Sequence, residues 1–202
     1  MRKLLLAALL ASPLASFAGG NLLTDGGFED AAVGAGSYAI FNGTSVPGWT
    51  AGNEIEVRYN VAGTAEEGHN YVELDANSNS SMSQSFATVV GGVYDLSFYY
   101  SNRAGTDAAT NGLTFSAGSL SGTAPLLAAN NTGDNVWSLY STTFTATSTT
   151  TTLAFAAAGT SDSYGSSLDN ISVTAAVPEP ETYALMLAGL AAMGYFVRRR
   201  RV

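Results

Sequence analysis

The sequence has no cysteine and only one histidine, and these shortages remove several classes of function. Without cysteine there are no disulfides, no thiolate catalysis and no cysteine-based zinc or iron–sulfur sites. His69 cannot form a usual zinc site alone, and no G-x-S-x-G nucleophile motif accompanies it. Glu66 and Glu67 are adjacent, so an extended strand would point them to opposite faces, unlike a glycosidase pair facing across a cleft. We therefore expect no enzymatic activity, with a carboxylate pair assembled by the fold as the alternative.

Basic residues are scarce in the middle of the chain. Of the eight, two open the chain and four nearly close it, which leaves Arg58 and Arg103 against fourteen acidic residues from Asp25 to Asp169. Nucleic-acid binding needs a basic footprint, so we exclude nucleic acid as a partner. An acidic surface is compatible with bound cations, sugars or simple solubility, and does not choose among them.

The longest apolar runs lie at the two ends of the chain, where targeting segments occur. At the N-terminus, Arg2 and Lys3 precede the apolar run 4–10, and Ser16-Phe17-Ala18 supplies the small residues that a signal peptidase reads. We interpret residues 1–18 as a signal peptide cleaved after Ala18. The alternative, an N-terminal membrane anchor, is disfavoured because the apolar run is too short to span a bilayer.

The C-terminus combines three features in a fixed order. Val177-Pro178-Glu179-Pro180-Glu181 is followed by an apolar stretch, 183–197, and then by an arginine cluster, Arg198, Arg199, Arg200 and Arg201. The prolines should keep the chain extended and out of a helix. The apolar stretch is slightly shorter than a usual spanning helix, but arginine stems can lengthen it. We expect a single transmembrane helix with cytoplasmic arginines, rather than a buried core helix.

This order of motifs resembles the PEP-CTERM sorting signal of Gram-negative bacteria, over residues 177–202. The resemblance implies processing by exosortase, a membrane protease-transpeptidase, with Pro178, Glu179 and Pro180 as the recognition element. It also implies export across the inner membrane, a transiently inserted and membrane-anchored intermediate, and a final location at the cell surface or outside the cell.

The middle of the chain, residues 19–176, alternates between apolar and polar residues in short segments. Strands are predicted over 55–59, 71–75, 82–86, 94–100, 113–115, 140–146, 153–157 and 171–173. Turn-rich links separate them, and no long helical period appears. About eight or nine short strands favour an all-β fold, an antiparallel β-sandwich. The threonines of 142–152 have no fixed period, so an ice-binding array is a disfavoured alternative.

Four short motifs in this middle resemble those of galactose-binding-like jelly rolls. They are Asn21-Leu22-Leu23-Thr24-Asp25-Gly26-Gly27-Phe28-Glu29, Val46-Pro47-Gly48-Trp49, Gly68-His69-Asn70-Tyr71-Val72-Glu73-Leu74-Asp75 and Leu168-Asp169-Asn170-Ile171-Ser172-Val173. The order is similar to carbohydrate-binding modules and to a cell-wall-associated jelly-roll family of unknown function. The resemblance implies a jelly-roll fold and a structural calcium ion, with Glu29 after the first strand and Asp169 before the last as ligands. The alternative is that both carboxylates cap turns.

Aromatic side chains are candidates for stacking on sugar rings. Trp49 follows the Pro47-Gly48 turn, and we expect it in the core. Tyr71 and Tyr99 fall on the presumed outer faces of their strands, so they are better stacking candidates, and Asn102 and Arg103 could bond hydroxyl groups.

We therefore predict an exported, non-catalytic module that binds or scaffolds exopolysaccharide at the cell surface. The alternative is a structural protein of the extracellular matrix or biofilm that binds no specific glycan. A glycoside-active enzyme is the third possibility.

Overall fold

The computed structural model describes residues 19–176 and 180–199. Residues 19–176 form one compact unit, and the helix at 180–199 belongs to another. The first unit consists of strands and one 3-10 turn, η1 (Ala108–Thr110). The strands are β1 (Tyr38–Val46), β2 (Trp49–Tyr59), β3 (Asn70–Glu73), β4 (Ser81–Ala87), β5 (Val93–Ser101), β6 (Leu113–Ala117), β7 (Leu120–Thr123), β8 (Ser138–Thr145), β9 (Thr150–Ala157) and β10 (Ser167–Ala175).

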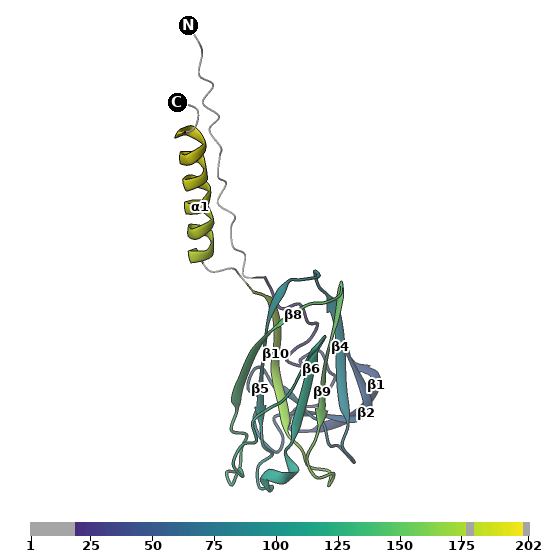
Figure 1. The fold of residues 1–202 in the computed structure, drawn as a ribbon. Helices are drawn as coiled ribbons and strands as arrows, with labels where there is room; N and C mark the ends of the chain where they lie inside the picture. Colours follow the sequence, from purple (N-terminus) through teal and green to yellow (C-terminus); the bar gives the residue numbers. More distant parts are fainter. Residues whose placement is uncertain (1–18, 177–179, 200–202) are drawn as a thin grey trace. The chain divides into compact units, whose positions relative to one another are not determined.

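The strands form a sandwich whose two layers are joined through β2. All the described pairs are antiparallel, and the strand order is β7-β6-β9-β4-β2-β3-β10-β5-β8, with β1 added on β2. The first part of β2 pairs with β4 at Thr50 and Ala51, and its second part pairs with β3 from Glu56 to Tyr59. In Figure 1, β5, β8 and β10 lie together in one layer, while β4, β6 and β9 lie in the other.

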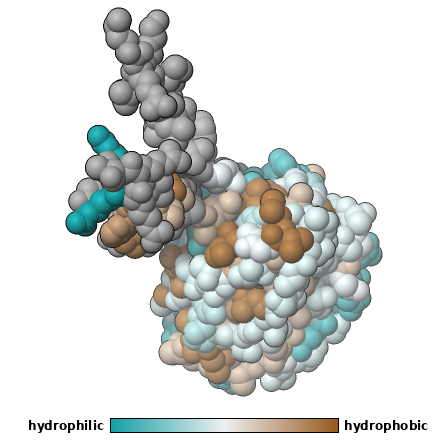
Figure 2. Space-filling view, turned by 45° about the horizontal axis from the view of Figure 1, so that its top comes forward, coloured by the Kyte–Doolittle hydropathy of each residue, from teal (hydrophilic) through white to brown (hydrophobic). Residues whose placement is uncertain are grey.

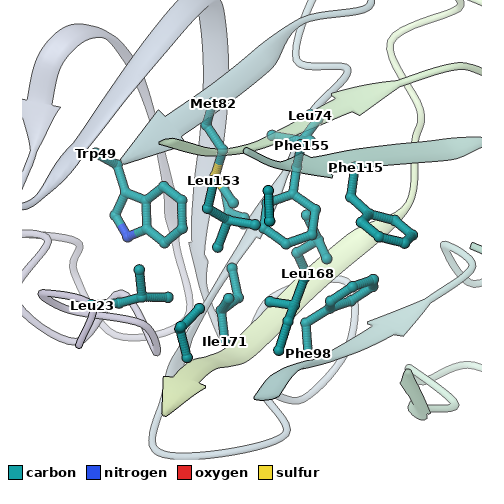
Figure 3. Packing of buried hydrophobic residues seen from close by; sticks show 14 of the residues in the cluster. Leu23, Trp49, Leu74, Met82, Phe98, Phe115, Leu153, Phe155, Leu168 and Ile171 are labelled. Atoms are coloured by element: carbon teal, nitrogen blue, oxygen red, sulfur yellow. The ribbon is translucent and has the colours of Figure 1, made fainter. Parts of the chain in front are cut away.

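The core lies between these layers, because alternate side chains of each strand point inward. Phe98 of β5 contacts the rings of Phe115 and Phe155, with centroids 5.5 and 4.9 Å away. Trp49 is buried as predicted; it packs on Phe28 and Phe155, and its indole N–H donates to the Asp25 carbonyl. Figure 3 shows how these side chains interlock with leucines from both layers. Each such side chain contributes about 1.5–3 kcal/mol by leaving water.

The predicted all-β antiparallel sandwich is confirmed, with two strands beyond those predicted. Neither has clean alternation: β1 contains a bulge around Gly43, and β7 is four residues long with Gly122 inside it. One expectation was wrong. Within the described residues no strand precedes Glu29, since 19–37 are turns and extended chain that hydrogen-bond to β10 through Leu22 and Gly26. Asp169 lies within β10, at an irregularity in its pairing with β5, and not before it.

The described part of the second unit is one helix, α1 (Pro180–Arg199), 20 residues long. The helix begins at Pro180, whereas the sequence predicted that this proline would keep the chain out of a helix. Proline is tolerated in the first turn, because its missing N–H has no partner there in any case. Among the described residues, no helix is both long and apolar enough to cross a membrane. The transmembrane helix that the sequence predicts is thus not seen among the described residues. The polar residues at each end of α1, Glu181 and Arg198 among them, leave only the shorter stretch between them apolar.

Some predicted features lie outside the described residues. These are the signal peptide with Ala18, Pro178 and Glu179 of the sorting motif, and Arg200 and Arg201 of the arginine cluster.

Candidate functional site

Two rows of side chains cross the outer face of β1, β2 and β3. In one row Tyr38, Arg58 and Tyr71 are directly opposite one another, and in the next row Glu56 is opposite Glu73. Alternation places these side chains away from the core, yet all except Tyr38 are buried. Buried charged side chains need partners, so this face is not an ordinary solvent-exposed sheet surface.

Arg58 supplies the partner for both glutamates. Like charges directly opposite each other in a sheet repel, so Glu56 and Glu73 need a cation between them. The Arg58 Nε donates to Glu56 Oε1, and its Nη2 lies 3.2 Å from Glu73 Oε2. Arg103, from the loop after β5, donates from Nη1 to both oxygens of Glu73, at 3.1 and 3.0 Å. The two arginines of the domain thus meet at one buried carboxylate.

The electrostatics of this cluster follow from its burial. Burial raises the pKa of Glu73 to about 7, although Arg58 and Arg103 act to lower it. For Arg58, burial acts to lower the pKa, but the charges of Glu73 and Glu56 outweigh it and the pKa is raised. Arg58 therefore stays charged, and burial is the dominant influence on the pKa of Glu73.

Above this cluster lies a cleft of about 280 Å³, lined by Tyr38, Glu56, Arg58, Val61, Ala62, Ala76, Arg103 and Ser163. Tyr38 at its rim is 56% exposed. The guanidinium of Arg103 lies 4.6 Å from the centroid of the Tyr164 ring, which fixes its plane by a cation–π contact. Ala62 and Ser163 both have positive φ, 58° and 67°, a conformation that non-glycine residues rarely adopt.

A larger groove, about 480 Å³, lies on the other layer over β6, β7 and β9. Its lining is made of serine, threonine, alanine, glycine and phenylalanine residues, with no charged side chain among the described residues that border it. The face of the domain seen in Figure 2 is mostly pale, with small separate apolar patches. The cleft is therefore the better candidate, because it combines a hollow, an exposed aromatic ring and charged groups.

The predicted calcium ligands face one loop from two sides. Glu29 Oε1 accepts hydrogen bonds from the amides of His69 and Asn70, both 2.7 Å long. Asp169 Oδ2 accepts from the amides of Glu66 and Glu67, at 2.7 and 3.1 Å. Burial raises the pKa of Asp169 to about 7. Both carboxylates thus accept hydrogen bonds from amides of the loop, and their role as calcium ligands stays a prediction. No cluster of three metal-binding side chains occurs in 19–176 or 180–199.

The predicted glycan-binding residues separate in the structure. Arg103 lines the cleft, but Tyr71 is fully buried, its hydroxyl donating to the Val61 carbonyl at 2.5 Å and its ring against Trp137. Tyr71 therefore cannot stack on a sugar, because loops cover the outer face of β3. Asn102 is also buried, and its amide holds the carbonyls of residues 127 and 128. Tyr99 is half-buried on β5, outside the cleft lining, and its role stays a prediction.

The sequence pattern did not indicate five residues of this site: Arg58, Glu56, Glu73, Tyr38 and Tyr164. One signal was available, since Arg58 and Arg103 are the only basic residues of the middle apart from a histidine. Their meeting depends on strand order and on the loop after β5, which no local pattern reveals.

Residues 21–174 match the family model described as "Protein of unknown function (DUF642)", and residues 176–201 match the PEP-CTERM protein-sorting motif. No curated protein matches the chain.

Several solved structures are similar in fold. A family 61 carbohydrate-binding module in complex with β-1,4-galactotriose is 15% identical, with a TM-score of 0.44, covering 77% of this chain and 99% of the other. A family 35 module from Clostridium thermocellum is 18% identical, with a TM-score of 0.44, covering 69% and 99%. A family 16 module is 15% identical, with a TM-score of 0.47, covering 76% and 99%. At these scores the likenesses carry no argument about what this chain binds.

Proposed function

The chain belongs to the DUF642 family, and on that premise we propose that its domain is a non-catalytic module that binds exopolysaccharide at the cleft. The observation that carries the proposal is the combination of the exposed ring of Tyr38 with Arg58, Arg103 and Glu56 in one hollow. A flat ring suits the apolar face of a pyranose, and fixed charged groups bind its polar substituents. Together they supply both halves of sugar recognition.

Binding is a better explanation of the cleft than hydrolysis. A glycosidase needs two carboxyl groups on opposite sides of the scissile bond. Among the described residues that line the cleft, Glu56 is the one carboxylate, and it is paired with Arg58. Glu73 is fully buried beneath the lining and held by both arginines. Neither group is placed to donate a proton to a leaving oxygen.

The sorting motif supports a location for this function. A PEP-CTERM motif implies export, exosortase processing and sorting to the cell surface. We propose that the domain acts there on polysaccharide of the cell's own matrix or biofilm, after exosortase has processed the tail near Pro178, Glu179 and Pro180. An acidic domain suits that location, because its charge opposes self-association.

Glycan-array binding of the full-length protein tests the proposal, with Tyr38→Ala and Tyr38→Phe as a matched pair. We expect binding to at least one polysaccharide, a loss of about tenfold or more in Tyr38→Ala, and little change in Tyr38→Phe, because phenylalanine keeps the ring. Absence of binding to every glycan would reject the proposal. It would favour the alternative, a structural matrix protein without a specific ligand.

We also propose that a calcium ion supports the loop between β2 and β3. Asp169 is fully buried, and no basic side chain pairs with it in the part of the chain that the structure describes. A Cβ added at Gly27 would lie 3.3 Å from Glu67 Oε2, 3.9 Å from Asp169 Oδ1 and 4.0 Å from Glu29 Cγ, so three acidic side chains border one backbone position. Carboxylate and carbonyl oxygens are the ligands that calcium prefers. Glu29 and Asp169 would hold the ion, and it would neutralise their charge.

The melting temperature of the full-length protein, measured with calcium and with a chelator, tests this site. We expect calcium to raise the melting temperature of the native protein and not that of Asp169→Asn. The exposed Asp95→Asn change on β5 is the control, and it should keep the response. An unchanged melting temperature in the native protein would count against the site.

A further inference from the structure

We propose that the cleft selects sugars that carry a carboxylate, the uronates, and that Arg103 binds that carboxylate while Arg58 adds its charge. This inference rests on the proposed function and goes beyond it, since it names the class of ligand. Its observations are the charge distribution of the domain, the hydrogen-bonding state of the two guanidinium groups, and the size of the cleft.

The charge distribution sets this cleft apart from the rest of the domain. Arg58 and Arg103 are 45 positions apart in the sequence and are the only arginine or lysine residues between Gly19 and Ala176, where fourteen residues are acidic. Both line the same cleft. A domain whose remaining surface repels anions thus has its fixed positive charge at one hollow. An anionic group of a ligand would find arginine side chains at this cleft and nowhere else in residues 19–176.

The two guanidinium groups keep unused donors. Arg58 is 3% exposed, yet its Nη1 makes no hydrogen bond within the described residues, an uncommon state for a buried charged group. Its remaining nitrogens are taken by Glu56 and Glu73. The Tyr71 hydroxyl, on the neighbouring strand, also interacts with the Arg58 charge. The Nη1 of Arg58 is enclosed by protein atoms, so Arg58 contributes its charge to the cleft, and a ligand acceptor would bind to the more open Arg103.

Arg103 is more open. Its side chain is 18% exposed, and all of its side-chain hydrogen bonds to described residues come from Nη1 and end on Glu73. The Tyr164 ring supports the flat face of the guanidinium at 4.6 Å. A guanidinium held in this way presents further N–H groups in a fixed plane, the arrangement that binds a carboxylate by two parallel hydrogen bonds.

The size of the cleft limits the rest of the ligand. At about 280 Å³ it lies at the small end of ligand sites, so it suits one sugar ring and not a long stretch of polysaccharide. Tyr38 lies directly across the strand pair from Arg58, so one ring can stack on Tyr38 while its substituent reaches the arginines. A uronate has its carboxylate on the ring itself, which matches this spacing.

Glu73 adds a pH dependence that supports the assignment. The charged and titratable groups around it are Glu56 and Arg58 on β2, Tyr71 on β3 and Arg103 after β5. With both glutamates ionised, the four charges of the cluster cancel. Protonation of Glu73 leaves one net positive charge and frees donors of both arginines. Binding of a uronate should therefore tighten as the pH falls from about 8 to about 6, while binding of a neutral sugar should not.

Isothermal titration of the full-length protein with oligomers of galacturonate, glucuronate and mannuronate tests the inference. Each is compared with its carboxyl-reduced counterpart, which keeps the linkage and loses the charge. We expect at least one acid to bind tenfold or more tighter than its reduced form. Equal binding of the two forms would overturn the inference and leave the proposed function standing. No binding of any acidic or neutral glycan would overturn both.

Two variants and one control locate the preference. Arg103→Gln should abolish the preference for the acid. Arg103→Lys should keep part of it, because lysine retains the positive charge but lacks the paired N–H donors of a guanidinium group. Thr147→Asp, in the exposed turn between β8 and β9, lowers the net charge by the same amount as Arg103→Gln and should not alter the preference. A full preference in a folded Arg103→Gln protein would overturn the assignment. Should that variant not fold, the native comparison of acid with reduced form, and Arg103→Lys, still decide.

Discussion

At the scale of single residues, Arg58 is the cation that allows two glutamates to share one face of β2 and β3. Removing it leaves Glu56 and Glu73 opposite each other, buried and short of a partner. We expect Arg58→Met to reduce the free energy of unfolding by about 3–5 kcal/mol, the usual effect of deleting one member of a buried ion pair. Urea denaturation measures it, with the exposed Asp95→Asn as a control expected within about 0.5 kcal/mol. A loss below about 1 kcal/mol for Arg58→Met would contradict this account.

Glu73 should make stability depend on pH. Because burial raises its pKa to about 7 from an ordinary value of 4.5, the folded protein holds this proton in a range where the unfolded chain has lost it. The contribution of Glu73 to stability is therefore present below about pH 4.5 and is lost as the pH rises to about 7. Relative to Glu73→Gln, the native protein should lose up to about 3 kcal/mol between pH 4.5 and 7.5, at about 1.4 kcal/mol per pKa unit. Parallel stability profiles of the two proteins would rule this out.

At the scale of elements, the strands were predictable where one face is apolar. The runs around Phe98, Phe144 and Phe155 alternate cleanly, because one side of each strand packs into the core while the other faces outward. The same alternation predicted that Tyr71 points outward. It could not predict that loops bury the outer face of β3, since coverage by loops depends on contacts between distant segments. Tyr71 was therefore predicted on the correct face of β3, but its exposure to solvent was predicted wrongly.

The segment before β1 docks on β10 without forming a strand, and Gly26 makes that docking possible. Its carbonyl accepts a hydrogen bond from the Ile171 amide at 2.9 Å, and a Cβ at this position would collide with the Ile171 carbonyl oxygen. We expect Gly26→Ala to lower the free energy of unfolding by about 1–3 kcal/mol, because backbone on both sides must shift. Gly34→Ala is the matched control: nothing lies within 4 Å of its Cβ position, so stability should be unchanged or slightly raised. Thermal unfolding of the pair measures the difference, and equal stabilities would show that the docking tolerates a side chain.

At the scale of the whole molecule, composition and end motifs predicted more than any single site did. The tail motif is read from a contiguous stretch, so its recognition needs no knowledge of tertiary structure. The all-β fold follows from many short alternating strands, which tolerate errors in any one of them. The cleft depends on β1, β2 and four loops meeting, and Tyr38 lies on a strand whose bulge hides its periodicity. The cleft could not be predicted from the sequence, because it forms only where several distant segments meet.

The division of the chain into separate units also predicts how the tail is processed. Residues 19–176 are compact without the tail, so cleavage near Pro178, Glu179 and Pro180 would release the domain with its core intact. We expect replacement of these three residues by alanine to leave the full-length chain unprocessed in cells that contain an exosortase, because the sorting motif implies that they are its recognition element. Glu181→Ala, one position beyond the motif, should be processed normally. The mass of the purified protein distinguishes the two, and loss of the tail from the triple variant would show that cleavage does not depend on this motif.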